Sequence, residues 1–117
     1  MKNDESDQVF EAELKRRFVK DFLDLLVLQM VKNRPAWGYK IIKETEKRCG
    51  VKLRHGALYP MLNTLETKGL LVSRKELEKG RIRKTYRITS QGKRLLQIYH
   101  DFLEEQTSEK KVANLEN

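Results

Sequence analysis

Apolar residues recur every three or four positions in the first part of the chain, which is the spacing of a helix with one apolar stripe. Between Val9 and Asn33 these positions are Phe10, Leu14, Phe18, Phe22, Leu25 and Leu26. The pattern predicts one long helix over residues 9–33. Residues 22–31 (FLDLLVLQMV) are apolar nearly all round and are expected to form the central core element. Pro35 should end the helix.

Two further helices are predicted in the middle of the chain. The first covers residues 37–49 after a short turn between Pro35 and Gly38, and Gly50 is expected to cap it. Its apolar stripe holds Trp37, Ile41, Thr45 and Cys49. The second follows the alternating stretch 51–53 and runs from Gly56 to Gly69, with Pro60 in its first turn. Its buried side is formed by Leu58, Leu62 and Leu65.

A β-hairpin and a last helix complete the pattern. Residues 70–77 and 83–88 are rich in β-branched or aromatic side chains and flank a glycine-bearing turn at 78–81. Thr89 or Ser90 then caps a helix over residues 90–106. The stripe of that helix holds Leu95, Ile98, Tyr99, Phe102 and Gln106. Residues 107–117 are expected to be a frayed polar tail.

This order of elements is that of a winged helix-turn-helix, a mainly α fold with a small β-hairpin. We expect one domain over residues 1–106, with a DNA-binding core at about 36–89 and an added C-terminal helix for dimerisation. In this fold the third helix enters the major groove of DNA, and the hairpin, or wing, straddles the adjacent backbone.

The charge distribution is consistent with a nucleic-acid partner. The 117 residues carry a formal charge of +8, and residues 31–100 hold 18 Lys/Arg against 5 Asp/Glu, while both ends of the chain are net acidic. Positive potential concentrated in this way is typical of proteins that bind polyanions, although basic surfaces also aid solubility. The position of the charges within the fold is therefore needed to distinguish nucleic-acid binding from a basic surface that aids solubility.

The predicted wing is the strongest basic element. Between positions 74 and 87 it carries seven cations, which are Arg74, Lys75, Lys79, Arg81, Arg83, Lys84 and Arg87. Lysines that protect a strand edge from aggregation explain one or two of them at most. We expect phosphate contacts from Lys79, Arg81, Arg83 and Lys84, and from Lys52, Arg54 and His55 just before the third helix.

The outward side of the third helix is small or polar. Asn63 can pair with adenine through two hydrogen bonds, and the methyl group of Thr64 can contact thymine. The candidate contacts on this helix are Gly56, Ala57, Tyr59, Pro60, Asn63 and Thr64. Asn and Thr are also common on ordinary solvated helix faces, so the neighbouring wing is what favours the DNA-binding interpretation.

Three stretches together resemble the PadR family of transcriptional regulators. They are GYKIIKE at 38–44, GALYPMLNTLETKGLL at 56–71 and KTYRITSQGKRLL at 84–96. The resemblance implies a homodimeric repressor in which the first and last helices form the dimer interface, with Tyr59 and its neighbours at the operator. The interface residues it implies are Phe10, Leu14, Phe18, Phe22, Leu95, Ile98, Tyr99 and Phe102.

Two features depart from the family pattern. The chain has a single C-terminal helix, as in the short PadR-like proteins, and Trp37 stands where the family varies. Some short relatives bind flat aromatic drugs at the dimer interface through a tryptophan on the last helix, which has none here. Tyr99 and Phe102 can stack on such a small-molecule effector, or they can serve as core or dimer contacts.

No motif points to catalysis, a metal or a cofactor. His55 and His100 lack the spacing of a metal pair, and no glycine-rich phosphate loop or nucleophile motif is present. Cys49 is interpreted as a packed thiol, with a redox sensor as the alternative. Without an apolar run long enough for a bilayer or a leader pattern, we expect a cytoplasmic protein with no membrane partner.

The sequence therefore predicts a dimeric, sequence-specific repressor of transcription that binds double-stranded DNA. Two alternatives remain open at this point. One is an architectural protein that coats DNA with little sequence preference, and the other is a winged-helix module that contacts only proteins. Both DNA-binding interpretations need the basic wing, but only the repressor needs Asn63 and Thr64 to contact bases.

Overall fold

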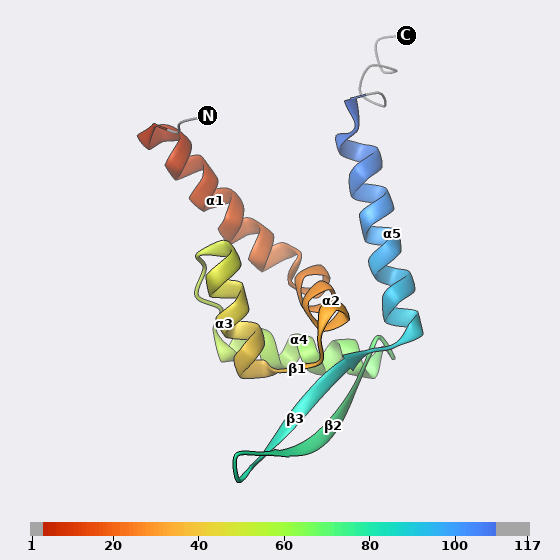
Figure 1. Ribbon diagram of the computed structural model, residues 1–117. Coiled ribbons are helices and arrows are strands. Elements are labelled where there is room, and N and C mark those ends of the chain that lie inside the picture. The colour runs from red at the N-terminus through yellow and green to blue at the C-terminus, as the bar shows by residue number, and fades with distance from the viewer. Residues whose placement is uncertain (1–3, 110–117) are drawn as a thin grey trace.

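A computed structural model describes residues 4–109 and confirms a mainly helical fold with a small antiparallel sheet (Figure 1). In chain order the elements are α1 (Glu5–Asp21), α2 (Leu23–Asn33), β1 (Ala36–Trp37), α3 (Gly38–Cys49), α4 (His55–Thr67), β2 (Leu71–Glu78), β3 (Arg81–Ile88) and α5 (Ser90–Thr107). The β2–β3 hairpin projects from one end of the molecule, and α1 and α5 extend from the other (Figure 1).

The predicted single helix over residues 9–33 is wrong, because the structure has two helices separated at Phe22. α1 starts earlier, at Glu5, since the side chain of Asp4 caps it by accepting a hydrogen bond from the Asp7 N–H at 2.9 Å. At Phe22 the backbone leaves helical geometry, with φ −119° and ψ 33°. A one-residue break preserves the spacing of three and four, so periodicity alone could not reveal it.

α2 is the central core element, as predicted. Val27 and Leu28 have no exposed surface, and α2 packs against α4, α5 and β3. A helix in contact with neighbours on several sides can bury apolar residues around most of its circumference, which explains the nearly continuous apolar run at 22–31.

α3 and α4 form the helix-turn-helix pair, with two corrections to the prediction. Trp37 precedes α3 as its N-cap residue and belongs to β1, so it is outside the helix whose stripe it was expected to share. α4 starts at His55, so Pro60 lies beyond its first turn. Because proline has no N–H group, position 60 cannot donate a helical hydrogen bond to the carbonyl of the exposed Gly56. The predicted buried stripe of Leu58, Leu62 and Leu65 is confirmed.

The sheet has three strands in the order β1–β3–β2, one more than the predicted hairpin. The segment expected to be a turn before α3 pairs with β3, with Ala36 opposite Tyr86 and Trp37 opposite Thr85. Two residues are too few to show strand alternation in a sequence. The hairpin itself is confirmed, and Lys79 and Gly80 form its turn with φ values of 49° and 77°.

Thr89 joins the end of the hairpin to α5. Its hydroxyl donates to the Gly69 carbonyl at 2.7 Å and accepts from the Gly92 N–H at 3.0 Å, so it caps α5 as predicted. α5 continues to Thr107, one residue past the predicted end. Most of the predicted polar tail, residues 110–117, lies outside the described residues.

Candidate nucleic-acid interface

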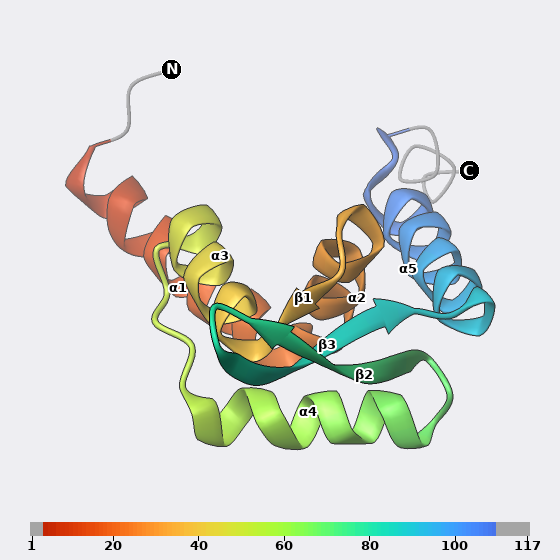
Figure 2. The same ribbon diagram turned by 60° about the horizontal axis from the view of Figure 1, so that its bottom comes forward.

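α4 lies at the outer edge of the molecule, next to the β2–β3 hairpin (Figure 2). Its buried leucines face the core. The six candidate contacts on this helix are all exposed: Gly56, Ala57, Tyr59, Pro60, Asn63 and Thr64. The structure therefore presents these residues together on an accessible helix face.

The start of α4 is electropositive. Arg54 occupies the N-cap position without a side-chain hydrogen bond, and Lys52 is exposed two residues before it. The His55 ring stacks on Tyr59 with 5.5 Å between ring centroids. Uncapped N–H groups and the helix dipole attract anions, and these two cations reinforce that effect.

Tyr59 contacts α3 as well as solvent. The side chain is 43% exposed. Its hydroxyl lies so near the buried Gly38 that a Cβ at position 38 would be 2.4 Å from it. Glycine at this position lets α3 and α4 approach closely, and Tyr59 fills the space.

The wing cations differ in whether a carboxylate pairs with them, as Lys84 and Arg87 show. Lys79 and Arg81 are exposed at the tip of the hairpin. Lys84 is held by Glu66 of α4 at 3.5 Å, and Glu66 also accepts a hydrogen bond from Ser73 at 2.5 Å. The hydrogen bond from Ser73 is the largest effect and lowers the pKa of the Glu66 carboxyl; burial opposes it, and the Lys84 charge adds to the lowering. Glu66 thus fastens the wing to α4, a role that the sequence did not predict.

Trp37 connects the wing to α3. The Nζ of Lys40 lies 5.0 Å from the centre of its ring, and the guanidinium carbon of Arg83 lies 4.8 Å from it. Arg83 is therefore half-buried, in contrast to the other twelve predicted DNA contacts, which are exposed. Beside it lies a cavity of about 430 Å³, whose lining includes Trp37, Tyr59, Asn63, Arg83 and Lys84.

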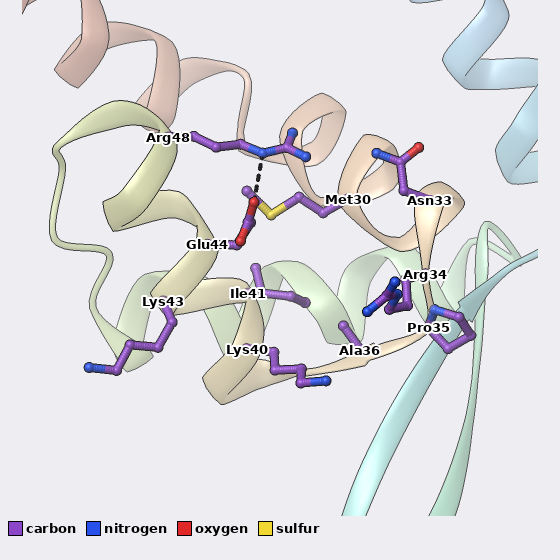
Figure 3. Close-up of a pocket in the computed structure, with 10 residues that line it drawn as sticks. All are labelled: Met30, Asn33, Arg34, Pro35, Ala36, Lys40, Ile41, Lys43, Glu44 and Arg48. Atoms are coloured by element: carbon purple, nitrogen blue, oxygen red, sulfur yellow. Dashed lines mark hydrogen bonds and ion pairs between the residues drawn. The ribbon is translucent and has the colours of Figure 1, made fainter.

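A second cavity of about 460 Å³ lies between the end of α2 and α3 (Figure 3). Met30, Ala36 and Ile41 contribute apolar atoms to it, and several cations surround them. One of these cations, Arg48, is engaged with Glu44 at 3.1 Å.

The predicted dimer residues are divided between exposed and partly buried positions. The exposed ones are Phe10, Leu14, Phe22, Ile98 and Phe102, and those that pack partly on the core are Phe18, Leu95 and Tyr99. The Tyr99 hydroxyl donates a hydrogen bond to Asp24 within the same chain. Cys49 is half-buried against the core.

Residues 4–109 hold neither a membrane-spanning helix nor a cluster of metal ligands. None of the helices in this range is both long enough and apolar enough to cross a bilayer. The same range contains no group of three or more His, Cys, Asp or Glu side chains arranged to hold a metal ion.

Comparison with known proteins identifies the family. Residues 27–98 match the "Transcriptional regulator PadR-like family", and this range runs from within α2 to the middle of α5. The chain belongs to the PadR-like family of transcriptional regulators. This PadR-like chain is 34% identical over 90 residues to transcriptional regulator Rv3488 of Mycobacterium tuberculosis, which corresponds to 77% of the chain and 83% of that protein.

Solved structures of PadR-like proteins share the winged-helix fold. A PadR family regulator from Eggerthella lenta superposes with a TM-score of 0.70 at 31% identity, covering 94% of this chain and 89% of that one. A putative transcriptional regulator from Thermoplasma acidophilum gives 0.69 at 27% identity, with 85% and 94% coverage. A PadR-like factor from Bacteroides fragilis, at 24% identity, gives 0.72 with 88% and 98% coverage and supports the fold alone.

Sequence reasoning placed no functional weight on Trp37, Lys40 or Glu66. The first two are close in sequence, but the contact of Trp37 with Arg83 depends on the pairing of β1 with β3, which no local pattern indicated. The Glu66 contacts join the end of α4 to both hairpin strands. The sequence signal that could have pointed to Glu66 is the presence of an acidic residue within a basic region.

Proposed function

We propose that this PadR-like protein is a dimeric repressor that reads a specific operator with α4 and holds the DNA backbone with the hairpin. The observation that carries the proposal is the exposed polar face of α4 beside a wing with seven cations. Direct readout needs hydrogen-bonding groups at the base edges, and cations at the phosphates supply affinity that is largely independent of sequence.

The ends of the molecule support the dimeric part of the proposal. α1 and α5 extend away from the wing and carry large exposed apolar side chains that the chain's own core does not cover (Figure 1). A second copy of the chain can cover them without obstructing α4 or the hairpin. Two-fold related subunits then present two α4 helices to two half-sites.

Competition between duplexes tests sequence specificity. The full chain is titrated with a duplex from the promoter of its own gene in the presence of random duplex. A specific regulator prefers the promoter by a factor of about 10³ or more at physiological salt. Equal affinity for the two duplexes would instead identify an architectural protein, and no salt-sensitive binding to either would identify a protein-contact module.

Asn63→Ala tests whether α4 supplies the discrimination. We expect a loss of about 1–3 kcal/mol on the operator, with random-duplex binding nearly unchanged, because a base contact is removed and no phosphate contact. Asn33→Ala makes the same chemical change at the end of α2 and should leave both affinities as they are. An unaltered operator preference in Asn63→Ala would show that Asn63 reads no base.

A further inference from the structure

We propose that the cavity beside Trp37 is a binding site, here called the phosphate seat, for one phosphate of the DNA backbone. The Trp37 ring forms one wall of this site and positions the Arg83 side chain in it. This inference rests on the proposed DNA binding and adds a specific site to it. The seat lies where the start of α3, the middle of α4 and strand β3 meet.

Strand pairing explains why Trp37 and Arg83 meet. Trp37 lies directly opposite Thr85 in the β1–β3 pair. Side chains two residues apart on a strand point to the same face of the sheet, so Arg83 is the diagonal neighbour of Trp37 on that face. Lys40, in the first turn of α3, supplies the second cation at the ring. The indole therefore holds the Arg83 guanidinium at the cavity, where a free surface side chain would not be fixed, while Lys40 lies over the same ring but lines the cavity between α2 and α3.

Two donors at this site lack acceptors. Over residues 4–109, the buried side-chain polar atoms without a hydrogen-bond partner are Trp37 Nε1 and Arg83 Nε. Both belong to residues that line the cavity. A buried donor without an acceptor is destabilising. After a small movement of either side chain, a phosphate oxygen can accept a hydrogen bond from its N–H group, which removes that cost.

The rest of the lining selects an anion. Lys84, which is also paired with Glu66, contributes a further cation, and α3 begins at Gly38 with no side-chain cap and no acidic residue in its first turn. Tyr59 and Asn63, which are on the exposed face of α4, line the same cavity. A phosphate bound there is next to the helix proposed to enter the groove, which favours the DNA backbone over a free phosphate ion.

The fluorescence of Trp37 provides a direct test, because the chain contains one tryptophan. The full chain is titrated with a short random duplex and, separately, with inorganic phosphate at constant ionic strength. We expect the duplex to change Trp37 emission and to lower its quenching by acrylamide about twofold, while millimolar phosphate does neither. A saturable response to phosphate alone would overturn the assignment to the DNA backbone.

Failure of this inference can be distinguished from failure of the proposed function. Binding of the duplex is followed independently by the anisotropy of a dye on the DNA. If the duplex binds while Trp37 emission and quenching stay constant, the phosphate seat is wrong and DNA binding stands. If the duplex does not bind, the proposed function itself fails.

A matched pair of variants tests the role of Arg83. Arg83→Gln and Arg81→Gln each remove one cation from β3, but only Arg83 lies over Trp37. We expect Arg83→Gln to abolish the Trp37 response and to weaken random-duplex binding about tenfold. Arg81→Gln should weaken binding by a smaller factor and retain the response. Retention of the full response in Arg83→Gln would overturn the proposal.

Variants at position 37 separate the ring from its N–H group, with circular dichroism to check folding. Trp37→Phe keeps an aromatic wall and should weaken duplex binding only a few fold. Trp37→Leu loses the ring that holds Arg83 and Lys40, so it should match Arg83→Gln and lower the dependence of log K on log salt by about one unit. Wild-type affinity and salt dependence in both variants would show that Trp37 has only a structural role.

Discussion

At the scale of single residues, the contact between Tyr99 and Asp24 gives the protein a measurable pH response. The hydroxyl of Tyr99, on α5, donates to the carboxylate of Asp24, at the start of α2. Burial and, secondarily, the hydrogen bond and charge of Asp24 raise the pKa of Tyr99 to about 12. The side chain was predicted as a core or dimer contact or as a stacking surface for an effector, and its hydroxyl joins two helices of one chain.

We expect the free energy of unfolding to fall as pH rises from about 10 to about 12. The folded chain keeps the Tyr99 proton over this window, whereas the unfolded chain loses it near pH 10, so the contribution is complete below pH 10 and lost above pH 12. Tyr99→Phe should reduce this fall and cost about 1 kcal/mol at pH 7. Urea unfolding at several pH values measures both effects.

Tyr39→Phe provides the control for this experiment, since it removes a hydroxyl from an exposed tyrosine on α3. Its pH profile should follow that of the wild type. Identical profiles for Tyr99→Phe and the wild type would contradict a role for the Tyr99–Asp24 contact.

The sequence predicts which single residues of the candidate site are exposed or charged, but not the contacts between them. Thirteen exposed or basic positions were identified from helix periodicity and charge, and the structure places twelve of them at the surface. Arg83 is half-buried because it packs on Trp37, and Lys84 is exposed but paired with Glu66. Both effects depend on contacts between elements distant in sequence, which composition and spacing cannot show.

At the scale of elements, the packing of α3 on α4 depends on a glycine, Gly38, which has no side chain to collide with α4. Gly38 and Tyr59 meet where the two helices approach, and any larger residue at position 38 collides with the tyrosine ring. Because Tyr59 is also one of the candidate DNA contacts, the same glycine controls both the packing of the two helices and the position of a side chain proposed to contact DNA.

Gly38→Ala should lower the free energy of unfolding by about 1–3 kcal/mol, since the added methyl group overpacks this contact. In a Tyr59→Ala background the same substitution should cost close to nothing, because the colliding ring is gone. Urea unfolding of the four proteins in this double-mutant cycle gives the coupling energy. An equal cost in both backgrounds would show that the strain arises elsewhere.

The elements themselves were predictable where a local signal exists. Repeated leucines marked α4, and the glycine between two basic strands marked the hairpin turn. The strand β1 and the break at Phe22 were missed for different physical reasons. β1 exists only through its pairing with β3, and the break leaves the apolar spacing intact while redirecting the chain.

At the scale of the whole molecule, the terminal helices leave large apolar side chains exposed. Phe10 and Phe102 are 67% and 57% exposed on α1 and α5. Exposed side chains of this size on two helices at the same end of the molecule contribute little to the stability of a single chain. In the proposed dimer they become buried contacts.

Phe102→Asp should convert the dimer into monomers, because burying an unpaired carboxylate in the interface costs several kcal/mol. The single chain should stay folded, since position 102 is exposed in it. Leu77→Asp, an equivalent change at an exposed position on β2 near the wing tip, should remain dimeric. Sedimentation at micromolar concentration measures both, and a dimeric Phe102→Asp would contradict this interface.

The break at Phe22 determines how the two halves of the proposed dimer can span an operator. α2 packs against α4, and the backbone angles at Phe22 fix the direction in which α1, with its share of the proposed dimer surface, leaves α2. Half-sites read by such dimers are separated by about 34–36 Å, one turn of DNA, and each added base pair moves one half-site by about 3.4 Å and rotates it. In the proposed dimer, a change of bend at Phe22 would therefore alter the length of operator that fits without altering any of the candidate DNA contacts.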